Sequence, residues 1–231
     1  MQLLLQSIGK VRGCYGPNRD QFPARAAFLA PDAAQSLTGM ISDLGSDRVA
    51  FSDIWRSGEA SLAAVQAKSG VQAPAYSGHN FGVSFDLDVE YTLRALGSDY
   101  PRLLQILEAH GWYCYRRDKK RGPEDWHFNF FGDDAPVFLR KLTAGHVTWP
   151  QGAEQAIQKH YPQQMFALTP AEIQGSLKQL GLYSGDLDGS LGPLSLQAVR
   201  AFCRAWKLAE GVTDDRFKRT LAFVSASIVR M

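Results

Sequence analysis

The sequence predicts an α+β domain with a small antiparallel sheet, followed by a small domain made of three helices. Before about residue 142, strand-like and helix-like segments do not alternate regularly, which is unlike the repeating pattern of a parallel doubly wound sheet. After about residue 168, only helical periodicity is present. Glycines and prolines between Gly145 and Pro162 predict a linker. We therefore expect domains at residues 1–142 and 168–231, joined by residues 143–167.

In the first domain, hydrophobic periodicity predicts two helices and four strands. Each helix is followed by a glycine, Gly45 or Gly111, which readily adopts the left-handed backbone that ends helices. The predicted elements are helices over 32–44 and 100–110 and strands over 48–56, 84–89, 112–115 and 126–131. The basic run 116–121 lies between the last two strands and predicts a solvated turn rather than a nucleic-acid surface.

The second domain begins with a strong helix-start signal. Thr169 can accept a hydrogen bond from the backbone N–H of Glu172, the Glu172 side chain can reach back, and Pro170 suits the first helical position. Apolar residues at helical spacing mark three helices; they are Ile173, Leu177 and Leu180, then Leu196, Val199, Phe202 and Trp206, then Phe217, Leu221, Val224 and Ile228. Three amphipathic helices can enclose one core. A further short helix is expected near residues 153–160, within the linker.

The composition is that of an ordinary globular protein and excludes several classes. Of the 231 residues, 45% are hydrophobic and 21% charged, and the net charge of +2 is too low to indicate a nucleic-acid partner. No segment reaches the ~18 apolar residues that a membrane span needs, and the start lacks the pattern of a secretory signal. Three cysteines without framework spacing argue against a disulfide-built domain. We expect a monomer that neither inserts into membranes nor binds nucleic acid.

Four residues carry the pattern of a hydrolytic metal site: His79, Asp86, Glu124 and His127. A catalytic zinc site needs three protein ligands and one open position for water. Two imidazoles and one carboxylate can supply the ligands, and a separate carboxylate can take a proton from water and pass it to the leaving amine. We assign His79, Asp86 and His127 as ligands of one Zn²⁺ ion and Glu124 as the base.

Two points of this assignment depend on backbone geometry. Glu124 and His127 are three residues apart and would face opposite sides of a regular strand, so Glu124 is expected in the loop that enters the strand or beside a bulge. Asp88 shares a strand face with Asp86 and is the alternative ligand. The other histidines are expected to be ordinary core or surface residues; they are His110, His146 and His160.

The spacing of these residues resembles the LAS group of zinc peptidases, named for lysostaphin, D-Ala-D-Ala peptidases and sonic hedgehog. The D-Ala-D-Ala carboxypeptidase branch typically shows Ser-x-His-x-x-Gly-x-x-x-Asp and then Glu-x-Trp-His. The residues that fit these patterns are Ser77, His79, Gly82 and Asp86, then Glu124, Trp126 and His127. The resemblance runs from about Val49 to Phe131 and implies zinc catalysis on a small sheet with flanking helices, similar to hedgehog and D,D-peptidases.

The resemblance also implies roles for residues outside the metal site. The family places an arginine in a strand-then-turn segment, followed by a glutamine, and Arg56 and Gln66 fit these places. Arg56 is then expected to stabilise the tetrahedral oxyanion or to hold a substrate carboxylate, tasks that suit an always-charged, two-point donor. Ser77 is expected to orient a ligand or to contact substrate, and Trp126 to pack rather than to react.

The second domain resembles the three-helix peptidoglycan-binding domain, which shows Leu-Gly-Tyr-x-x-Gly-x-x-Asp-Gly-x-x-Gly before a helix with Ala-Val-x-x-Phe. The matching stretch covers residues 180–202. A calcium loop is the rival interpretation of Asp186 and Asp188, but the run of ligands is too short. The family usually has Gln after the Phe, where this chain has Cys203. We expect this module to bind peptidoglycan, with Tyr183 and Asp188 facing the glycan.

The two resemblances imply a zinc metallopeptidase that hydrolyses the stem peptides of bacterial peptidoglycan. A catalyst tethered to a solid substrate gains effective concentration. Without a signal peptide, the chain is expected to be made in a host cytoplasm as a phage endolysin and to act on the cell wall after a holin opens the membrane. A bacterial enzyme with a misassigned start codon is the competing interpretation. The bond is either D-Ala-D-Ala (carboxypeptidase) or L-Ala-D-Glu (endopeptidase), and the alternative function is a non-catalytic zinc protein that only binds the wall.

Overall fold

The computed structural model describes residues 3–13, 27–67, 73–114, 124–144 and 149–228. Contacts between residues divide the chain into two compact units. The sheet unit comprises Leu4–Arg56 and Tyr76–His160, and the helical unit comprises Met1–Leu3, Ser57–Ala75 and Tyr161–Met231. Residues 57–75 thus group with the C-terminal helices, whereas the sequence boundaries placed them in the first domain.

The sheet unit combines short strands with helices of up to 14 residues. Its elements are β1 (Gln6–Ser7), β2 (Phe28–Leu29), α1 (Pro31–Leu44), β3 (Phe51–Asp53), the 3₁₀-helix η2 (Gly78–Phe81), β4 (Ser84–Leu87), α3 (Val89–Leu96), α4 (Tyr100–Ala109), β5 (Trp112–Cys114), β6 (His127–Phe130), η3 (Gly132–Asp134), α5 (Ala135–Thr143) and α6 (Trp149–His160). The α+β class predicted from the sequence is confirmed.

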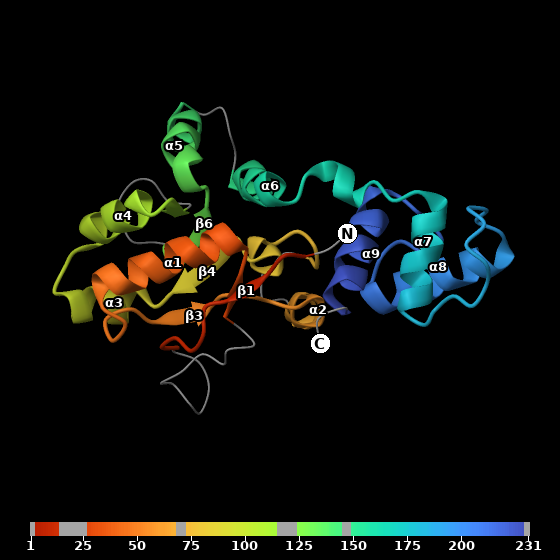
Figure 1. Ribbon diagram of the computed structural model, residues 1–231, viewed down its shortest axis with the longest axis horizontal. Helices are drawn as coiled ribbons and strands as arrows, with labels where there is room; N and C mark the ends of the chain where they lie inside the picture. The colour runs from red at the N-terminus through yellow and green to blue at the C-terminus, as the bar shows by residue number, and fades with distance from the viewer. Residues whose placement is uncertain (1–2, 14–26, 68–72, 115–123, 145–148, 229–231) are drawn as a thin grey trace. The chain divides into compact units, whose positions relative to one another are not determined.

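The central sheet has four antiparallel strands in the order β3-β4-β6-β5, and β1 pairs separately with β2 (Figure 1). Across β4 and β6, Ser84 lies opposite Asn129 and Asp86 lies opposite His127. Directly opposed residues of an antiparallel pair project to the same face. These four polar side chains therefore share one face of the sheet, which we call the polar face.

The opposite face of the sheet is apolar and forms the core of this unit. Phe85 and Phe128 alternate with the polar residues and stack with ring centroids 5.4 Å apart. Phe85 also contacts Phe51 and Trp112, with ring centroids 5.3 and 4.4 Å away. Helix α1 packs on this side, because the indole N–H of Trp112 donates to the hydroxyl of Ser36 at 2.9 Å. The apolar face thus packs into the core of the sheet unit, and the polar side chains lie on the other face of the sheet.

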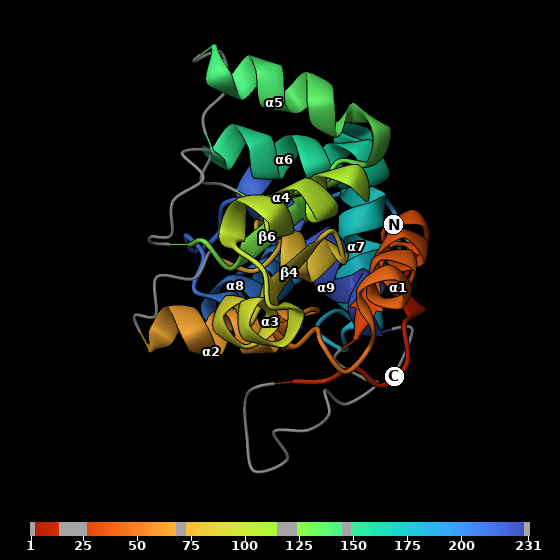
Figure 2. The same cartoon turned by 90° about the vertical axis from the view of Figure 1, so that its left-hand side faces the viewer.

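Helices α5 and α6 run side by side, as Figure 2 shows. Gly152 of α6 lies against the ring of Phe138 in α5, which leaves no room for a Cβ. The ammonium group of Lys159 donates to the carbonyl of Phe131 at 2.7 Å, which attaches α6 to the end of β6. Helix α6 also contacts η2. It is therefore part of the sheet unit, whereas the sequence predicted a short helix near residues 153–160 within a linker.

The strands are shorter than the sequence predicted. The strand expected over 48–56 is reduced to β3, because the backbone N–H of Arg56 donates to the carbonyl of His79 at 3.2 Å rather than to a neighbouring strand. The strand expected over 84–89 ends at Leu87, because Asp88 caps the unpredicted helix α3 by accepting from the backbone N–H of Tyr91. In both places the chain leaves the sheet close to the polar residues.

The helical unit contains α2 (Gly58–Gln66), η4 (Gln163–Phe166), α7 (Pro170–Gln179), α8 (Pro193–Trp206) and α9 (Asp215–Ile228). The predicted capping box is present, since Thr169 and Glu172 each accept from the other's backbone N–H. Helix α2 was not predicted. It packs here because Gly58 has no side chain: a Cβ would lie only 3.0 Å from Trp206 and 3.1 Å from Phe223.

Two of the three cysteines lie in the part of the chain that the structure describes. Cys114 and Cys203 are buried, as expected of small apolar side chains. Cys14, His146 and the basic run 116–121 lie outside the described residues. Within the described ranges, no helix combines the length and the apolar character needed to cross a membrane.

Candidate metal centre

Three side chains converge on the polar face of the sheet. Asp86 and His127 come from directly opposed positions of β4 and β6, and η2 brings His79 to them. Nδ1 of His127 lies 2.8 Å from Oδ1 of Asp86, and Nε2 of His79 lies 3.2 Å from each of these two atoms. The structure thus unites the three residues predicted to be ligands in a group that could hold a metal ion.

The separations of these three atoms fit one tetrahedral ion. Bonds of about 2.0–2.1 Å to zinc place neighbouring ligand atoms about 3.3 Å apart. The side chain of His79 is 2% exposed, whereas those of His127 and Asp86 are 14% and 15% exposed. One predicted ligand therefore lies in the interior, while the other two are partly exposed to solvent, an arrangement that suits an ion with one open position.

A hydrogen bond holds His79 in the tautomer that a metal ligand needs. Its Nδ1 lies 2.8 Å from the carbonyl oxygen of Ile54. Because a carbonyl can only accept, Nδ1 carries the proton, and in the neutral ring Nε2 presents its lone pair to the site. The segment that follows β3 therefore orients the imidazole of His79, which belongs to η2.

The residues around His79 shape the short helix that carries it. The hydroxyl of Ser77 caps η2 by accepting from the backbone N–H of His79 at 3.3 Å. Gly82 ends η2 with φ of +66°, and a Cβ at this position would lie 2.8 Å from backbone atoms of Leu29 and Ala30. Glycine is therefore required at position 82 both by the left-handed backbone and by the close approach of β2.

We expect Gly82→Ala to destabilise the protein more than Gly97→Ala does. Both glycines have similar φ, +66° and +60°, but a Cβ at Gly97 meets nothing within 4 Å. The control, Gly97→Ala, should lower the free energy of unfolding by about 1 kcal/mol, because alanine is strained in the left-handed region. Gly82→Ala should lower it by about 1–3 kcal/mol more, because the added Cβ overpacks against β2. Thermal unfolding of the two variants measures the difference. Equal losses would mean that η2 can shift away from β2 at no cost.

The charges of the triad act on one another. Burial by itself lowers the pKa of His79, but the negative charges of Asp86 and Asp53 and the hydrogen bond to Asp86 outweigh it and leave this pKa raised. Burial by itself raises the pKa of Asp86, but the charge of His79 and hydrogen bonds from both imidazoles hold it well below its usual range. The metal-free triad therefore favours a protonated His79 beside an ionised Asp86.

These shifts predict that zinc and protons compete for the triad. Because the fold raises the pKa of His79, protonation of this residue stabilises the metal-free protein fully below pH 6.5, the ordinary pKa of histidine. This contribution is lost as the pH rises through the pKa of His79 in the folded protein. Because the fold lowers the pKa of Asp86, the ionised carboxylate stabilises the protein above pH 3.8, the ordinary pKa of aspartate. That contribution is lost only in strong acid. Zinc needs the neutral imidazole. Raising the pH from about 6 to about 8 should therefore widen the gap in melting temperature between zinc-loaded and metal-free protein. A gap that stays constant would contradict this coupling.

Glu124 lies in a turn directly before β6, as the sequence spacing required. Its carbonyl accepts from the backbone N–H of His127 at 3.2 Å, and its φ of 63° is uncommon for a residue other than glycine. The hydroxyl of Tyr100 donates to the next carbonyl, that of Asp125, at 2.9 Å and holds the turn. The Glu124 residue is exposed. Strain of about 1–3 kcal/mol at such a position is typical of functional sites.

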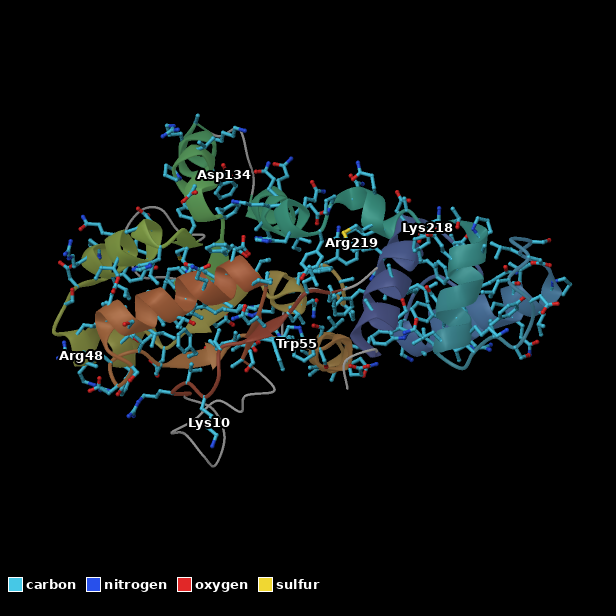
Figure 3. The ribbon with its side chains drawn as sticks, viewed as in Figure 1. Lys10, Arg48, Trp55, Asp134, Lys218 and Arg219 are labelled. Carbon is cyan, nitrogen blue, oxygen red and sulfur yellow. The ribbon has the colours of Figure 1, made fainter. Side chains whose placement is uncertain are left out.

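Arg56 follows β3, and hydrogen bonds hold its backbone to the segment that carries His79. Its backbone N–H donates to the carbonyl of His79 at 3.2 Å, and the side-chain amide of Asn80 donates to its carbonyl at 2.8 Å. The indole of Trp55, labelled in Figure 3, donates to the carbonyl of Asn80 at 3.2 Å. The guanidinium pairs with Asp53, whose Oδ2 accepts from Nε at 3.0 Å and also from Nη2.

Two of these residues had no role in the sequence analysis. Asp53 lies three positions before Arg56, and this spacing of opposite charges could have indicated the pair. Asn80 is fully buried, and its partner is 24 positions away in the sequence. No local pattern distinguishes such an asparagine from one in an exposed turn.

The structure also shows the surroundings of three further residues that the sequence analysis considered. Asp88, the alternative ligand, caps α3 and accepts from the backbone N–H of Tyr91 at 2.9 Å, so Asp86 is the acid of the triad. Trp126, expected to pack, is 39% exposed and precedes His127 in the sequence. Gln66 is exposed at the end of α2, in the helical unit.

In the helical unit, Tyr183 and Asp188 belong to a network around the buried Gln174. The Nε2 atom of Gln174 lies 3.2 Å from the hydroxyl of Tyr183 and 2.8 Å from Oδ1 of Asp188, and its Oε1 accepts from the backbone N–H of Gly189 at 2.9 Å. Tyr183 is 8% exposed. This geometry gives both residues a part in holding the loop between α7 and α8. Their role in glycan binding remains a prediction.

Comparisons with known proteins find a structural likeness but no match in sequence. No family model matches the chain, and a search of curated proteins finds no match. Among solved structures, the chain is similar to one described as the structure of the LdcB LD-carboxypeptidase that reveals the molecular basis of peptidoglycan recognition. The TM-score is 0.44 with 17% identity, over 66% of this chain and 78% of that one. This similarity is too low to indicate a shared function. The assignment of the site therefore depends on the geometry of its residues alone.

Proposed function

We propose that this protein is a zinc-dependent peptidase that hydrolyses peptide bonds in the stem peptides of bacterial peptidoglycan. The observation that carries the proposal is the convergence of His79, Asp86 and His127, with ligand atoms 2.8–3.2 Å apart. The resemblance of the surrounding motifs to the LAS group supports zinc as the ion and peptidoglycan as the substrate class. When bound, the ion supplies a Lewis acid that polarises the scissile carbonyl and makes water more acidic.

The residues of this chain have distinct tasks in the hydrolysis. Glu124 takes a proton from water as the water oxygen bonds to the carbonyl carbon. The carbon–nitrogen bond then breaks, and Glu124 passes the proton to the leaving amine, so one water and one amide become a carboxylic acid and an amine. Arg56 donates to the oxygen on which negative charge develops. Ser77 positions the segment that carries His79.

For the helical unit we propose binding to the cell wall, with the whole chain acting as a phage endolysin. A binding module raises the local concentration of the enzyme on an insoluble polymer without improving the active site. Pelleting of the metal-free full chain with purified peptidoglycan sacculi measures this binding apart from cleavage. A chain that stays in the supernatant would leave the helical unit without the proposed role.

Removal of the metal is expected to abolish the activity. Digestion of purified peptidoglycan by the zinc-loaded protein should release fragments that mass spectrometry identifies as products of stem-peptide cleavage. Treatment with a chelator should lower the rate by at least about 10³-fold, since the ion supplies several kcal/mol of stabilisation of the transition state. One equivalent of zinc should restore the rate. Undiminished cleavage by chelated protein would rule out the proposed function.

A further inference from the structure

Beside the triad, the polar face of the sheet carries a buried pair of small polar side chains, Ser84 and Asn129. They lie opposite each other across the two central strands, two positions before Asp86 in β4 and two positions after His127 in β6. Both are fully buried, and the hydroxyl of Ser84 donates to Oδ1 of Asn129 at 2.5 Å. The polar face therefore has two adjoining rows, one with two predicted ligands and one with the Ser84–Asn129 pair.

The short helix η2 lies directly on this pair. A Cβ at Gly78, the first residue of η2, would lie 1.9 Å from the hydroxyl oxygen of Ser84 and 3.0 Å from Oδ1 of Asn129. Because glycine has no side chain, the backbone of η2 can approach the pair this closely. The next residue, His79, reaches the other two predicted ligands. The order of residues along η2 thus matches the two rows of the sheet.

Backbone hydrogen bonds keep η2 from moving away from the pair. The carbonyl of Gly78 accepts from the backbone N–H of Val83, directly before β4, at 3.0 Å. The carbonyl of His79 accepts from the backbone N–H of Arg56 at 3.2 Å, and the imidazole is held by the carbonyl of Ile54. Because these bonds hold η2 against the sheet, the size and arrangement of the Ser84–Asn129 pair determine how high η2 lies above it.

Stability does not explain why this position is polar. A buried hydroxyl and a buried amide lose their hydrogen bonds to water, and an apolar pair of the same shape can be as stable or more stable. In the part of the chain that the structure describes, Nδ2 of Asn129 is also buried without an acceptor. What the bond between Ser84 and Asn129 does provide is one fixed arrangement of two side chains, and with it a support of defined height for Gly78.

Zinc binding is sensitive to this height. Bonds from zinc to imidazole nitrogen are about 2.0–2.1 Å long and tolerate deviations of about 0.2 Å, so a shift of His79 by about 1 Å would break its bond to the ion. We propose that Ser84 and Asn129 are positioning residues that set the distance of His79 from Asp86 and His127, and thereby the affinity for zinc. The inference rests on the zinc centre of the proposed function but not on peptide hydrolysis.

The first test removes the hydrogen bond of the pair. Ser84→Ala and Asn129→Ala should each lower zinc affinity by about tenfold, the lower end of the about 10–100-fold loss seen when a ligand loses a supporting residue. The double variant should bind zinc no more weakly than either single variant, because the two side chains form one support. Calorimetric titration of the metal-free proteins with zinc measures these affinities. Additive losses, or unchanged affinity in all three folded variants, would overturn the inference.

The second test disturbs the fit of Gly78 and then restores it. Gly78→Ala should lower zinc affinity by about 10–100-fold, because the new Cβ pushes η2 from the sheet or turns the hydroxyl of Ser84 away from Asn129. Adding Ser84→Gly removes the atom that this Cβ meets first and should recover most of the affinity. Gly185→Ala, in the helical unit, is the control, since its Cβ would lie 2.5 Å from the hydroxyl of Tyr183. It should lower stability and leave zinc affinity unchanged.

These titrations separate failure of the inference from failure of the proposed function. Equal loss of zinc affinity in Gly78→Ala and Gly185→Ala would mean that general destabilisation weakens zinc binding, and it would overturn the positioning role. If Gly78→Ala does not fold, the milder variants Ser84→Ala and Asn129→Ala still decide that role. If the wild type binds zinc but cleaves no peptidoglycan, the proposed function fails and the zinc affinities still test the pair. A wild type that binds no zinc would overturn both.

Discussion

Glu124→Gln should lower kcat for peptidoglycan hydrolysis by about 10²–10⁴-fold, the usual contribution of a positioned general base. Glutamine has nearly the shape of glutamate but cannot accept the proton of the attacking water. Because Glu124 is not among the triad, the variant should bind one zinc ion with unchanged affinity. Steady-state kinetics on a soluble muropeptide, together with zinc titration, measure the two properties separately.

Two matched variants make this result specific. Glu90→Gln removes a charge from an exposed residue in the first turn of α3 and should leave kcat unchanged. Glu124→Gly should also be inactive, but it should be as stable as the wild type or up to about 1 kcal/mol more stable, because glycine adopts a φ of 63° without strain. If Glu124→Gln cleaves normally, the base is misassigned.

His79→Ala should lose zinc and activity together. It removes one of three ligands, so zinc affinity should fall by more than the about 10–100-fold that follows loss of a hydrogen-bond partner to a ligand. Without the metal, hydrolysis should drop below detection. In the metal-free state, the variant also removes the cation that stabilises the ionised Asp86. Calorimetric zinc titration at about pH 8, where protons compete least, measures the affinity.

His110→Ala is the matched control for the loss of an imidazole. His110 ends α4 and pairs with Asp43 at 3.1 Å, outside the triad. Its replacement should cost some stability and leave zinc affinity and kcat unchanged. Equal loss of zinc in both variants would indicate that the ion binds somewhere other than the polar face of the sheet.

The sequence by itself predicted the parts of this protein whose causes are local. The helices ended by Gly45 and begun by Thr169 follow from caps and from the spacing of apolar residues, which act within one or two turns. The proposed ligand set followed from chemistry, because few residue types bind zinc and leave it reactive. The motif spacing was sufficient to choose Asp86 over Asp88, and the turn before β6 was required by the distance of three residues between Glu124 and His127.

Only the tertiary structure decided which distant segments stabilise one another. The bonds from Ile54 to His79 and from Asn80 to Arg56 join positions 25 and 24 residues apart, and no periodicity within one segment reports such a pairing. The same holds for α2, whose glycine at position 58 fits against Trp206 and Phe223 of the C-terminal helices. Side-chain packing selects these contacts from many that the local pattern allows.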